Sequence, residues 1–214
     1  PQPPRPIVLE GDALAAWLSA RAGKLTASRM ADAMDFRKDG KPGAARVKLM
    51  HEILAERMTG DSVRHYVNDA MQWGLDREAE AKAAYEAETG AMIAEAGFYD
   101  HPRIDLFGAT PDGLLDGGGL IEIKCPTTQT FVDWRLAGMI PAQHEPQMLA
   151  QLAVTGRAWC EFVAFDPRVR DPRYRLFVRR YEPPRAEIER IEAAAEAFLG
   201  DVEKMWEALT GAAP

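Results

Sequence analysis

Acidic and basic side chains that could do chemistry together occur within residues 104–126, IDLFGATPDGLLDGGGLIEIKCP. Asp112 follows one short apolar run, and Glu122 and Lys124 lie two residues apart within a second. Alternate residues of a β-strand point to the same face, so Glu122 and Lys124 should share a face and the intervening apolar residues should point to the other. Asp112, Glu122 and Lys124 can therefore converge on one point.

Two carboxylates at one point can hold Mg²⁺ or Mn²⁺, because these ions prefer oxygen ligands and retain waters that a substrate can displace. Such a cation could polarise a phosphodiester and lower the pKa of a bound water, and a neighbouring lysine could orient that water or stabilise negative charge. The same residues also suit a surface turn followed by a strand whose Glu122 and Lys124 form a solvated pair. The pattern alone leaves both interpretations open.

The elements that must position these side chains are two short strands, over residues 104–109 and 120–125. The segment between them contains Pro111, Gly113 and three consecutive glycines, which are turn signals. The pattern predicts a β-hairpin formed by these two strands, with the carboxylates and the lysine at its turn and on its returning strand.

Apolar periodicity and terminal glycines predict helices before and after this hairpin. Residues 92–99, 159–165 and 174–181 predict further strands. The order indicates an α/β or α+β fold with a central mixed sheet flanked by helices. The predicted helices cover residues 12–20, a segment that starts near Thr26 or Ser28, and residues 45–58, 69–89, 127–138, 144–156 and 185–209.

With 214 residues, of which 47% are hydrophobic, the chain can bury one sizeable core. We expect one domain over residues 1–214, with a loose start over residues 1–10 and an amphipathic helix over residues 185–209 packed on the core. No apolar run approaches the roughly 20 residues that cross a bilayer, and no signal peptide is recognisable, so a cytoplasmic protein without membrane contact is expected. Cys125 and Cys160 are expected to be core thiols.

The net charge of −7 is unevenly distributed along the chain. Residues 21–48 contain eight lysines and arginines against three aspartates, and residues 157–185 contain eight arginines against four acidic residues. The acidic excess lies in residues 76–95 and 186–207. Such a distribution could guide nucleic acid into a groove and repel it elsewhere, although ordinary solvated faces would give the same composition.

The segment RAGKLTAS places Arg21, Lys24, Thr26 and Ser28 around a predicted helix N-terminus. Free N–H groups and the helix dipole favour an anion at such a position, and a phosphate would fit there. Thr26 or Ser28 could instead simply cap the helix, and one residue can do both.

Taken in order, several separated motifs resemble the YqaJ-type viral recombinase family of lambda-exonuclease-like alkaline exonucleases, within the PD-(D/E)XK nuclease superfamily. The matching landmarks extend from residue 12 to residue 208. They are RAGKLTAS, ILAERMTG, WG followed by Glu78 and AEAKAAYE, TPDGL, LIEIKCP, PQMLAQLAVTG and AFDPR. The resemblance implies a restriction-endonuclease-like core.

The resemblance also implies roles for individual residues of the nuclease site. Asp112 and Glu122 would bind the metal, together with the backbone carbonyl of Ile123. Lys124 would position or activate the attacking water. Glu78 matches a helix glutamate that completes the active site, and Gln147 matches a glutamine of the following helix.

The family pattern further implies that Arg21 and Ser28 receive the terminal 5′-phosphate, with Thr110 in place of a serine beside the PDG turn. Lys24 and Thr26 belong to the same candidate DNA-binding segment. Family members carry one more acidic residue upstream of PDG. Neither Asp100 nor Asp105 aligns with it, so this position stays unassigned.

The implied activity is Mg²⁺-dependent 5′-to-3′ hydrolysis of one strand of linear double-stranded DNA, with Mn²⁺ as a substitute and two ions about 4 Å apart. It would release 5′-mononucleotides and leave 3′ overhangs for phage-type recombination. The family implies a homotrimeric ring, a single-strand annealing protein as partner, and the cytoplasm of a bacterial host as location.

Two other functions fit the same residues. A restriction-like or junction-resolving endonuclease would use the same metal site but cut within DNA. A catalytically silent module would bind DNA ends without cutting, although the joint presence of Asp112, Glu122 and Lys124 argues against it. A relative with an iron–sulfur cluster is disfavoured, because it needs four cysteines and the chain has two.

Overall fold

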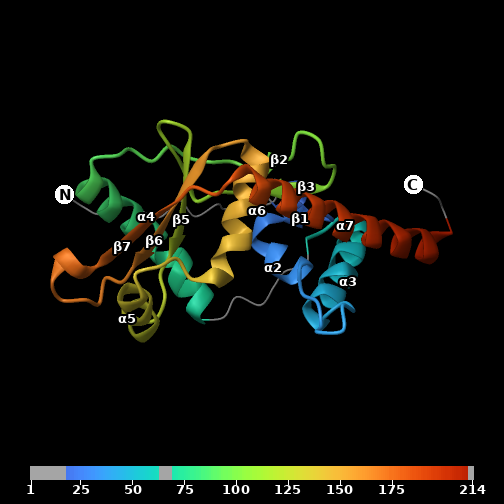
Figure 1. Ribbon diagram of the computed structural model, residues 1–214, viewed down its shortest axis with the longest axis horizontal. Helices are drawn as coiled ribbons and strands as arrows, with labels where there is room; N and C mark the ends of the chain where they lie inside the picture. Colours follow the sequence, from blue (N-terminus) through green and yellow to red (C-terminus); the bar gives the residue numbers. More distant parts are fainter. Residues whose placement is uncertain (1–17, 63–68, 212–214) are drawn as a thin grey trace.

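The computed structural model describes residues 18–62 and 69–211, which form two mixed sheets flanked by helices (Figure 1). In the larger sheet, β5 and β6 are parallel and each outer pair is antiparallel. The prediction of an α/β fold with mixed sheet structure is therefore confirmed. The order of this sheet is β4 (Gly113–Leu115), β5 (Gly119–Lys124), β6 (Trp159–Phe165) and β7 (Leu176–Tyr181).

Helices cover both faces of the larger sheet. On one face, Ala81 and Tyr85 of α4 (Asp69–Thr89) pack on Ile121 and Ile123 of β5. On the other face, α5 (Thr128–Ala137) and α6 (Glu145–Thr155) pack on Leu120 and its neighbours. Strand β5 is therefore buried on both faces, with Leu120 on one face and Ile121 and Ile123 on the other.

The smaller sheet joins segments that are far apart in the sequence. Strand β3 (Phe107–Ala109) lies between β1 (Leu25–Thr26), to which it is parallel, and β2 (Tyr99–Asp100), to which it is antiparallel. Its register pairs Thr26 with Gly108. The N-terminal segment is thereby held close to the residues that follow β3.

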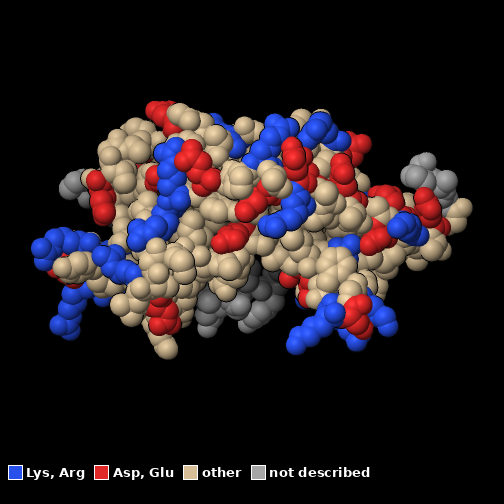
Figure 2. Space-filling model, viewed as in Figure 1, with Lys and Arg blue, Asp and Glu red and all other residues tan. Residues whose placement is uncertain are grey.

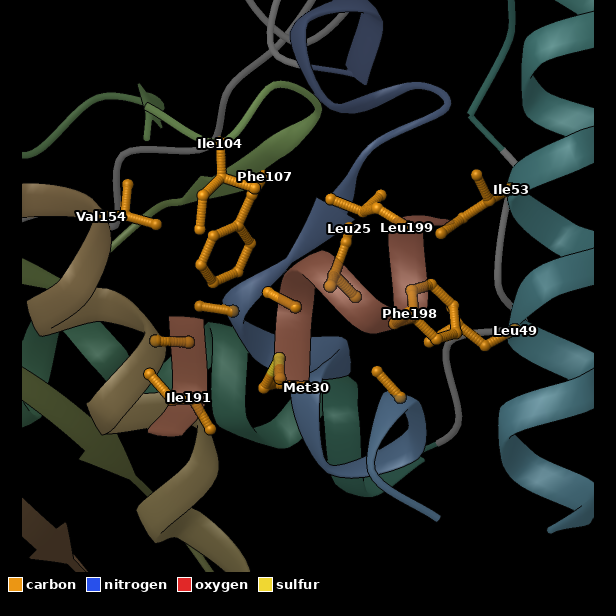
Figure 3. Packing of buried hydrophobic residues seen from close by; sticks show 14 of the residues in the cluster. Leu25, Met30, Leu49, Ile53, Ile104, Phe107, Val154, Ile191, Phe198 and Leu199 are labelled. Carbon is orange, nitrogen blue, oxygen red and sulfur yellow. The ribbon is translucent and has the colours of Figure 1, made fainter. Parts of the chain in front are cut away.

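A second core lies between the smaller sheet and the remaining helices (Figure 3). It is formed with α2 (Met30–Ala33), α3 (Ala44–Thr59) and α7 (Arg185–Thr210). Helix α6 contributes to this core through one face and to the larger sheet through another, so all of its residues from Met148 to Val154 are buried. This helix connects the two halves of the fold.

Most predicted helices are confirmed with similar bounds. Helices α3, α5 and α6 each end at a glycine with positive φ, as the terminal glycines in the sequence indicated. The C-terminal helix α7 buries one face, formed by Ile191, Ala195, Phe198, Leu199 and Val202. Of the predicted helix over residues 12–20, residues 12–17 lie outside the described residues, and residues 18–21 are helical.

The predicted hairpin between residues 104–109 and 120–125 is wrong. Strand β5 pairs instead with β4, which directly precedes the turn. Gly117 and Gly118 both have positive φ and close this turn within three residues, so the residues adjacent to it pair first. Strand β3 is left to pair with β1 and β2.

Three further predictions of local structure are corrected. The predicted strand over residues 92–99 is reduced to Tyr99 of β2 and an isolated bridge between Ala94 and Leu114. The helix predicted to start near Thr26 or Ser28 does begin there, at Ala27, but as a 3-10 helix (Ala27–Arg29) that leads into α2; Thr26 itself belongs to β1. The last strand begins at Leu176 because Pro172–Tyr174 form a 3-10 turn.

Both cysteines are free thiols; Cys160 is buried and Cys125 is half-buried. Burial and the nearby Glu78 raise the pKa of Cys125 to about 12, so it stays protonated at neutral pH. The interpretation of these residues as core thiols is confirmed for Cys160. In the described ranges, no helix combines the length and apolarity required to cross a bilayer.

Candidate active site

Strand β5 alternates as the sequence predicted. Ile121 and Ile123 point toward α4, whereas Glu122 and Lys124 lie on the face covered by α6. The period of two is a local property of an extended chain, so it does not depend on which strands flank β5. Strand geometry therefore presents one carboxylate and one ammonium group to the same side.

Glu122 is the centre of a buried polar network. Its side chain is 0% exposed, and it forms an ion pair with Lys124. The side-chain amide of Gln151, also 0% exposed, donates a hydrogen bond from Nε2 to Glu122 Oε2 at 2.6 Å. A carboxylate removed from water is costly unless it is paired, so Lys124 and Gln151 together compensate the burial of Glu122 and fix its position.

Asp112 directly precedes β4 and reaches the same network. Strand β4 begins at Gly113, which pairs with Ile121, so the pairing of β4 with β5 does not extend to Ile123. The Ile123 N–H donates instead to Asp112 Oδ2 at 2.6 Å. Burial and the charge of Glu122 raise the pKa of Asp112 well above its ordinary value. The two carboxylates thus repel each other across the end of β5.

Lys124 is the cation of the site. Burial opposes its charge, but the carboxylates of Glu122 and Asp112 more than offset this and raise the pKa of Lys124 above its ordinary value. Its Nζ donates to Gln147 Oε1 at 3.5 Å, a long hydrogen bond. Burial and the charge of Lys124 lower the pKa of His144 to about 4, so this imidazole is neutral above that pH.

Glu78 approaches the site from α4, which covers the opposite face of the sheet. It forms the predicted i,i+4 ion pair with Lys82, at 2.8 Å between Oε1 and Nζ. Its charge also contributes to the raised pKa of Asp112. Glu78 is therefore close enough to act electrostatically on the site while it is paired with Lys82.

The donor set fits a hard divalent cation. Glu122 is fully buried beside Lys124 Nζ, and burial together with the charge of Glu122 destabilises Asp112 as an anion. Because the N–H and C=O of a strand residue point to the same edge, the carbonyl of Ile123 faces the side on which its N–H meets Asp112. Within residues 18–62 and 69–211, no three His, Cys, Asp or Glu side chains lie close enough to hold a metal by themselves. A cation would therefore rest on two carboxylates and a backbone carbonyl, with water as its other ligands.

Three of the residues predicted to take a phosphate, Arg21, Thr26 and Ser28, line a small cavity of about 80 Å³. Arg21 Nη1 donates to Thr110 Oγ1 at 3.2 Å, and the hydroxyls of Thr26 and Ser28 lie 3.3 Å apart. Burial and the charge of Arg29 lower the pKa of Arg21 from its ordinary value, and the carboxylate of Glu56 partly offsets this effect. We call this site the anion pocket; its lining is Arg21, Thr26, Ser28, Arg29, Glu56 and Ser62.

The anion pocket adjoins the carboxylates because Thr110 and Asp112 lie two residues apart. The chain between them can span at most about 7 Å. Strand β3 anchors Thr110 beside β1, and β4 anchors Asp112 beside β5. The short connection between the two sheets thus sets the distance between the two sites.

The remaining predicted residues lie outside this arrangement. Lys24 is not part of the pocket lining: its Nζ forms an ion pair with Asp100 Oδ1 at 2.6 Å and lies over the ring of Phe98. Asp105 is exposed in the turn before β3. The structure therefore gives no reason to add Asp100 or Asp105 to the candidate metal ligands.

Sequence reasoning missed two functional candidates. Gln151 lies one helical turn after Gln147 on the same face of α6, a spacing that could have indicated it. Arg29 was counted only as part of a basic stretch, yet it lines the anion pocket and pairs with Glu52 at 2.9 Å and Glu56 at 3.3 Å. Its role depends on α3, so no local signal marks it.

Comparison with known proteins agrees with this arrangement. Residues 16–158 match the model of the YqaJ-like viral recombinase domain. A search of curated sequences gave no significant match. The chain is 42% identical to the alkaline exonuclease LHK-Exo from Laribacter hongkongensis, with a TM-score of 0.82, over 91% of this chain and 95% of that one.

Two other structures extend the comparison. LHK-Exo in complex with dAMP has the same identity and coverage, with a TM-score of 0.83. A phage-related exonuclease from Haemophilus somnus 129PT is 13% identical, with a TM-score of 0.66 over 87% of this chain and 96% of that one, and so shares its fold. Given the family match and the similarity to LHK-Exo, the chain belongs to the YqaJ-like viral recombinase domain family and has the fold of phage-related exonucleases.

Proposed function

We propose that the chain is a metal-dependent 5′-to-3′ exonuclease that degrades one strand of linear double-stranded DNA. The observation that carries this proposal is the anion pocket beside the carboxylate pair, joined by Thr110 and Asp112. A terminal 5′-phosphate bound by Arg21 would bring the adjacent phosphodiester to Glu122 and Lys124. Such a pocket would place the cleaved bond at a fixed distance from the DNA end, as an exonuclease requires.

The chain's own residues supply orientation and charge. Asp112, Glu122 and the carbonyl of Ile123 would hold Mg²⁺, or Mn²⁺ in its place, and we expect two ions per site. Bound there, the metal would lower the pKa of a water and stabilise negative charge on the phosphodiester. Lys124, fixed by Glu122, would orient the attacking water and stabilise the charge that develops in the transition state.

The solved relative supports the expected product. LHK-Exo has been crystallised with dAMP, which is a 5′-mononucleotide. Release of 5′-mononucleotides from one strand would leave 3′ single-stranded overhangs, the substrate of a single-strand annealing protein in phage-type recombination. We place this activity in the cytoplasm of a bacterial host.

We further propose that the chain acts as a homotrimeric ring around duplex DNA, as the family resemblance implies. A ring could direct the basic stretches inward although the net charge is −7. Sedimentation or light scattering would measure this directly, and a monomer at working concentrations would exclude the ring.

The direct test compares three DNA substrates in Mg²⁺: a linear duplex with a 5′-phosphate, the same duplex with a 5′-hydroxyl, and a covalently closed circle. We expect strong degradation of the phosphorylated linear duplex only, with mononucleotides as product. Cutting of the circle would favour the endonuclease alternative. Binding without any cleavage would favour the silent end-binding module.

Arg21 tests the pocket within the same assay. Arg21→Ala should reduce the preference for 5′-phosphorylated ends by about tenfold or more, because a charge-assisted hydrogen bond to the phosphate is lost. The rate on 5′-hydroxyl ends should change little. The matched control is Arg37→Ala, an exposed arginine paired with Asp39. An unchanged preference in Arg21→Ala would remove this residue from end recognition.

A further inference from the structure

The connection between β6 and β7, residues 166–175, lies at the same edge of the sheet as the active site. Strands β5 and β6 are parallel, and Lys124 pairs with Ala164. Their C-terminal ends therefore meet, and the chain leaves β6 beside the carboxylates. A hydrogen bond links this connection directly to the end of β5: Arg168 Nη2 donates to the carbonyl of Pro126, which follows β5, at 2.7 Å.

This connection is strongly basic. Residues 166–175 contain four arginines and two aspartates, and both aspartates are hydrogen-bonded to arginines of the same connection. Figure 2 shows Lys and Arg side chains gathered at the end of the molecule where Figure 1 places this connection. We call the following residues the arginine surface: Arg135, Arg168, Arg170, Arg173, Arg175, Arg179 and Tyr174.

The AFDPR motif fixes the arginine nearest to the site. Asp166 is fully buried and accepts from the backbone N–H of Arg168 at 3.0 Å and from its Nε at 2.7 Å. Although burial opposes it, these hydrogen bonds and one from Thr128 hold the pKa of Asp166 below its ordinary value. The guanidinium of Arg168 also lies 4.7 Å from the ring centroid of Trp73 on α4. Arg168 is thus held rigidly although its side chain is 42% exposed.

Tyr174 adds an aromatic group to this surface. It is 50% exposed, and its ring lies 5.3 Å from the guanidinium of Arg135 and 5.6 Å from that of Arg173. Guanidinium groups held beside an aromatic ring provide both charge and stacking area, the combination that nucleic-acid surfaces use. An ordinary solvated face does not require an exposed tyrosine.

The anion pocket and the arginine surface lie on opposite sides of β5. Thr110 and Asp112 approach from the β4 side, whereas residues 166–175 follow β6. A DNA strand whose 5′ end occupies the anion pocket can pass the carboxylates and continue toward the arginine surface. The next phosphates of the same strand would then meet these arginines.

We propose that the arginine surface binds the phosphate backbone of the duplex downstream of the scissile phosphodiester, while the anion pocket holds the 5′ end. This proposal rests on the proposed exonuclease function and adds a second DNA contact to it. The surface recognises charge and not base sequence, because arginine contacts to phosphates carry no sequence information. Its contribution should therefore be independent of end phosphorylation.

The test measures duplex binding in Ca²⁺ without Mg²⁺, with a check that the DNA stays intact. The variant is Arg170→Ala/Arg173→Ala, which leaves the Arg168 contact with Pro126 in place. The control is Arg185→Ala/Lys204→Ala on α7, which also removes two exposed positive charges, each paired with an acidic residue. Removing two phosphate contacts should weaken binding about tenfold and reduce the slope of log affinity against log salt by about 2.

Four outcomes decide the proposal. Equal losses for 5′-phosphate and 5′-hydroxyl duplexes, absent from the control, support it, and Arg170→Lys/Arg173→Lys should restore most of the affinity. Loss confined to 5′-phosphorylated duplexes overturns the assignment to the downstream backbone. Wild-type affinity in the alanine variant, with unchanged thermal stability, also overturns it. If the wild-type protein itself does not bind duplex DNA, the proposed exonuclease function fails instead.

Discussion

At the scale of single residues, the site depends on a compensated buried charge. Glu122 is inaccessible to water, and its stabilisation comes from Lys124 and Gln151. Asp112 adds a second carboxylate, and its repulsion with Glu122 raises the electrostatic free energy of the metal-free site. A site with this excess of buried negative charge is ready to accept a cation, which explains why activity and metal binding should respond together to changes in these residues.

Lys124→Ala should lower kcat by about 10²- to 10³-fold with little change in KM, because a positioned charge stabilises the transition state more than bound DNA. The measurement is steady-state degradation of a 5′-phosphorylated duplex in Mg²⁺. Lys48→Ala is the control, since this lysine is 77% exposed on α3. A wild-type kcat in Lys124→Ala would leave Lys124 as a structural partner of Glu122 alone.

Gln151→Leu should raise the Mg²⁺ concentration needed for half-maximal activity about 10- to 100-fold, because the orientation of Glu122 is lost while side-chain volume is nearly kept. The control is Gln143→Leu, an exposed glutamine before α6. An Mg²⁺ titration measures the shift. If Gln151→Leu lowers thermal stability but leaves the Mg²⁺ dependence unchanged, its role is in folding and not in metal positioning.

At the scale of elements, helix α6 and strand β3 make the site possible. Helix α6 packs on both cores and carries both glutamines, so it cannot shift without disturbing the fold. Strand β3 brings the N-terminal segment to Thr110. The anion pocket and the carboxylates are therefore held by packed elements at the two ends of the connection from Thr110 to Asp112. This arrangement favours a fixed distance between the bound 5′ end and the phosphodiester that is cleaved.

Arg46 joins three helices through a buried charge. It is 2% exposed and its Nη2 donates to Asp201 Oδ2 of α7 at 2.8 Å; Nη1 donates to the carbonyl of Ala33. Its guanidinium also lies between the rings of Phe36 and Phe198. This residue therefore connects α2, α3 and α7.

Arg46→Ala should lower the free energy of unfolding by about 3–5 kcal/mol, because it leaves the groups that it paired without partners and opens a cavity. Denaturant unfolding measures this. Remote from the carboxylates, the variant should keep near wild-type kcat under conditions where it is folded. A change of less than about 1 kcal/mol would show that water replaces these contacts, as it does at exposed pairs such as Arg185 and Glu189.

At the scale of the whole molecule, the charge of the active site should make global stability depend on pH and metal. The folded-state pKa of Asp112 is raised above its ordinary value, so its protonated form is favoured by folding. In metal-free protein this contribution is complete below the ordinary aspartate pKa and is lost as pH rises through the raised one. Mg²⁺ binds the ionised form, so stabilisation by Mg²⁺ should increase over the same pH range.

Thermal unfolding with EDTA and with Mg²⁺ across this pH range measures the effect. The free energy of unfolding in EDTA should fall by at most about 1.4 kcal/mol per pH unit from this group. Asp112→Asn, which cannot ionise, should show a flatter pH profile and little Mg²⁺ stabilisation. Identical pH profiles for the variant and the wild-type protein would contradict the repulsion between Asp112 and Glu122.

The amino-acid sequence by itself determined the local features of this protein. The alternation of Glu122 and Lys124 on β5 follows from the period of two in any strand. The ends of α3, α5 and α6 follow from glycines that adopt positive φ more readily than other residues. These features depend on neighbouring residues only, so they can be predicted without knowing what packs against them.

Only the tertiary structure decided which elements meet. The pairing of β5 with β4 depends on a turn closed by Gly117 and Gly118, and the pattern of apolar runs does not distinguish it from a longer hairpin. Arg21 and Thr110 are 89 residues apart, yet β1 and β3 bring them into contact. Such long-range contacts form because they allow both cores to bury their apolar residues together. These residues come from many segments, so no single segment of the sequence predicts the contacts.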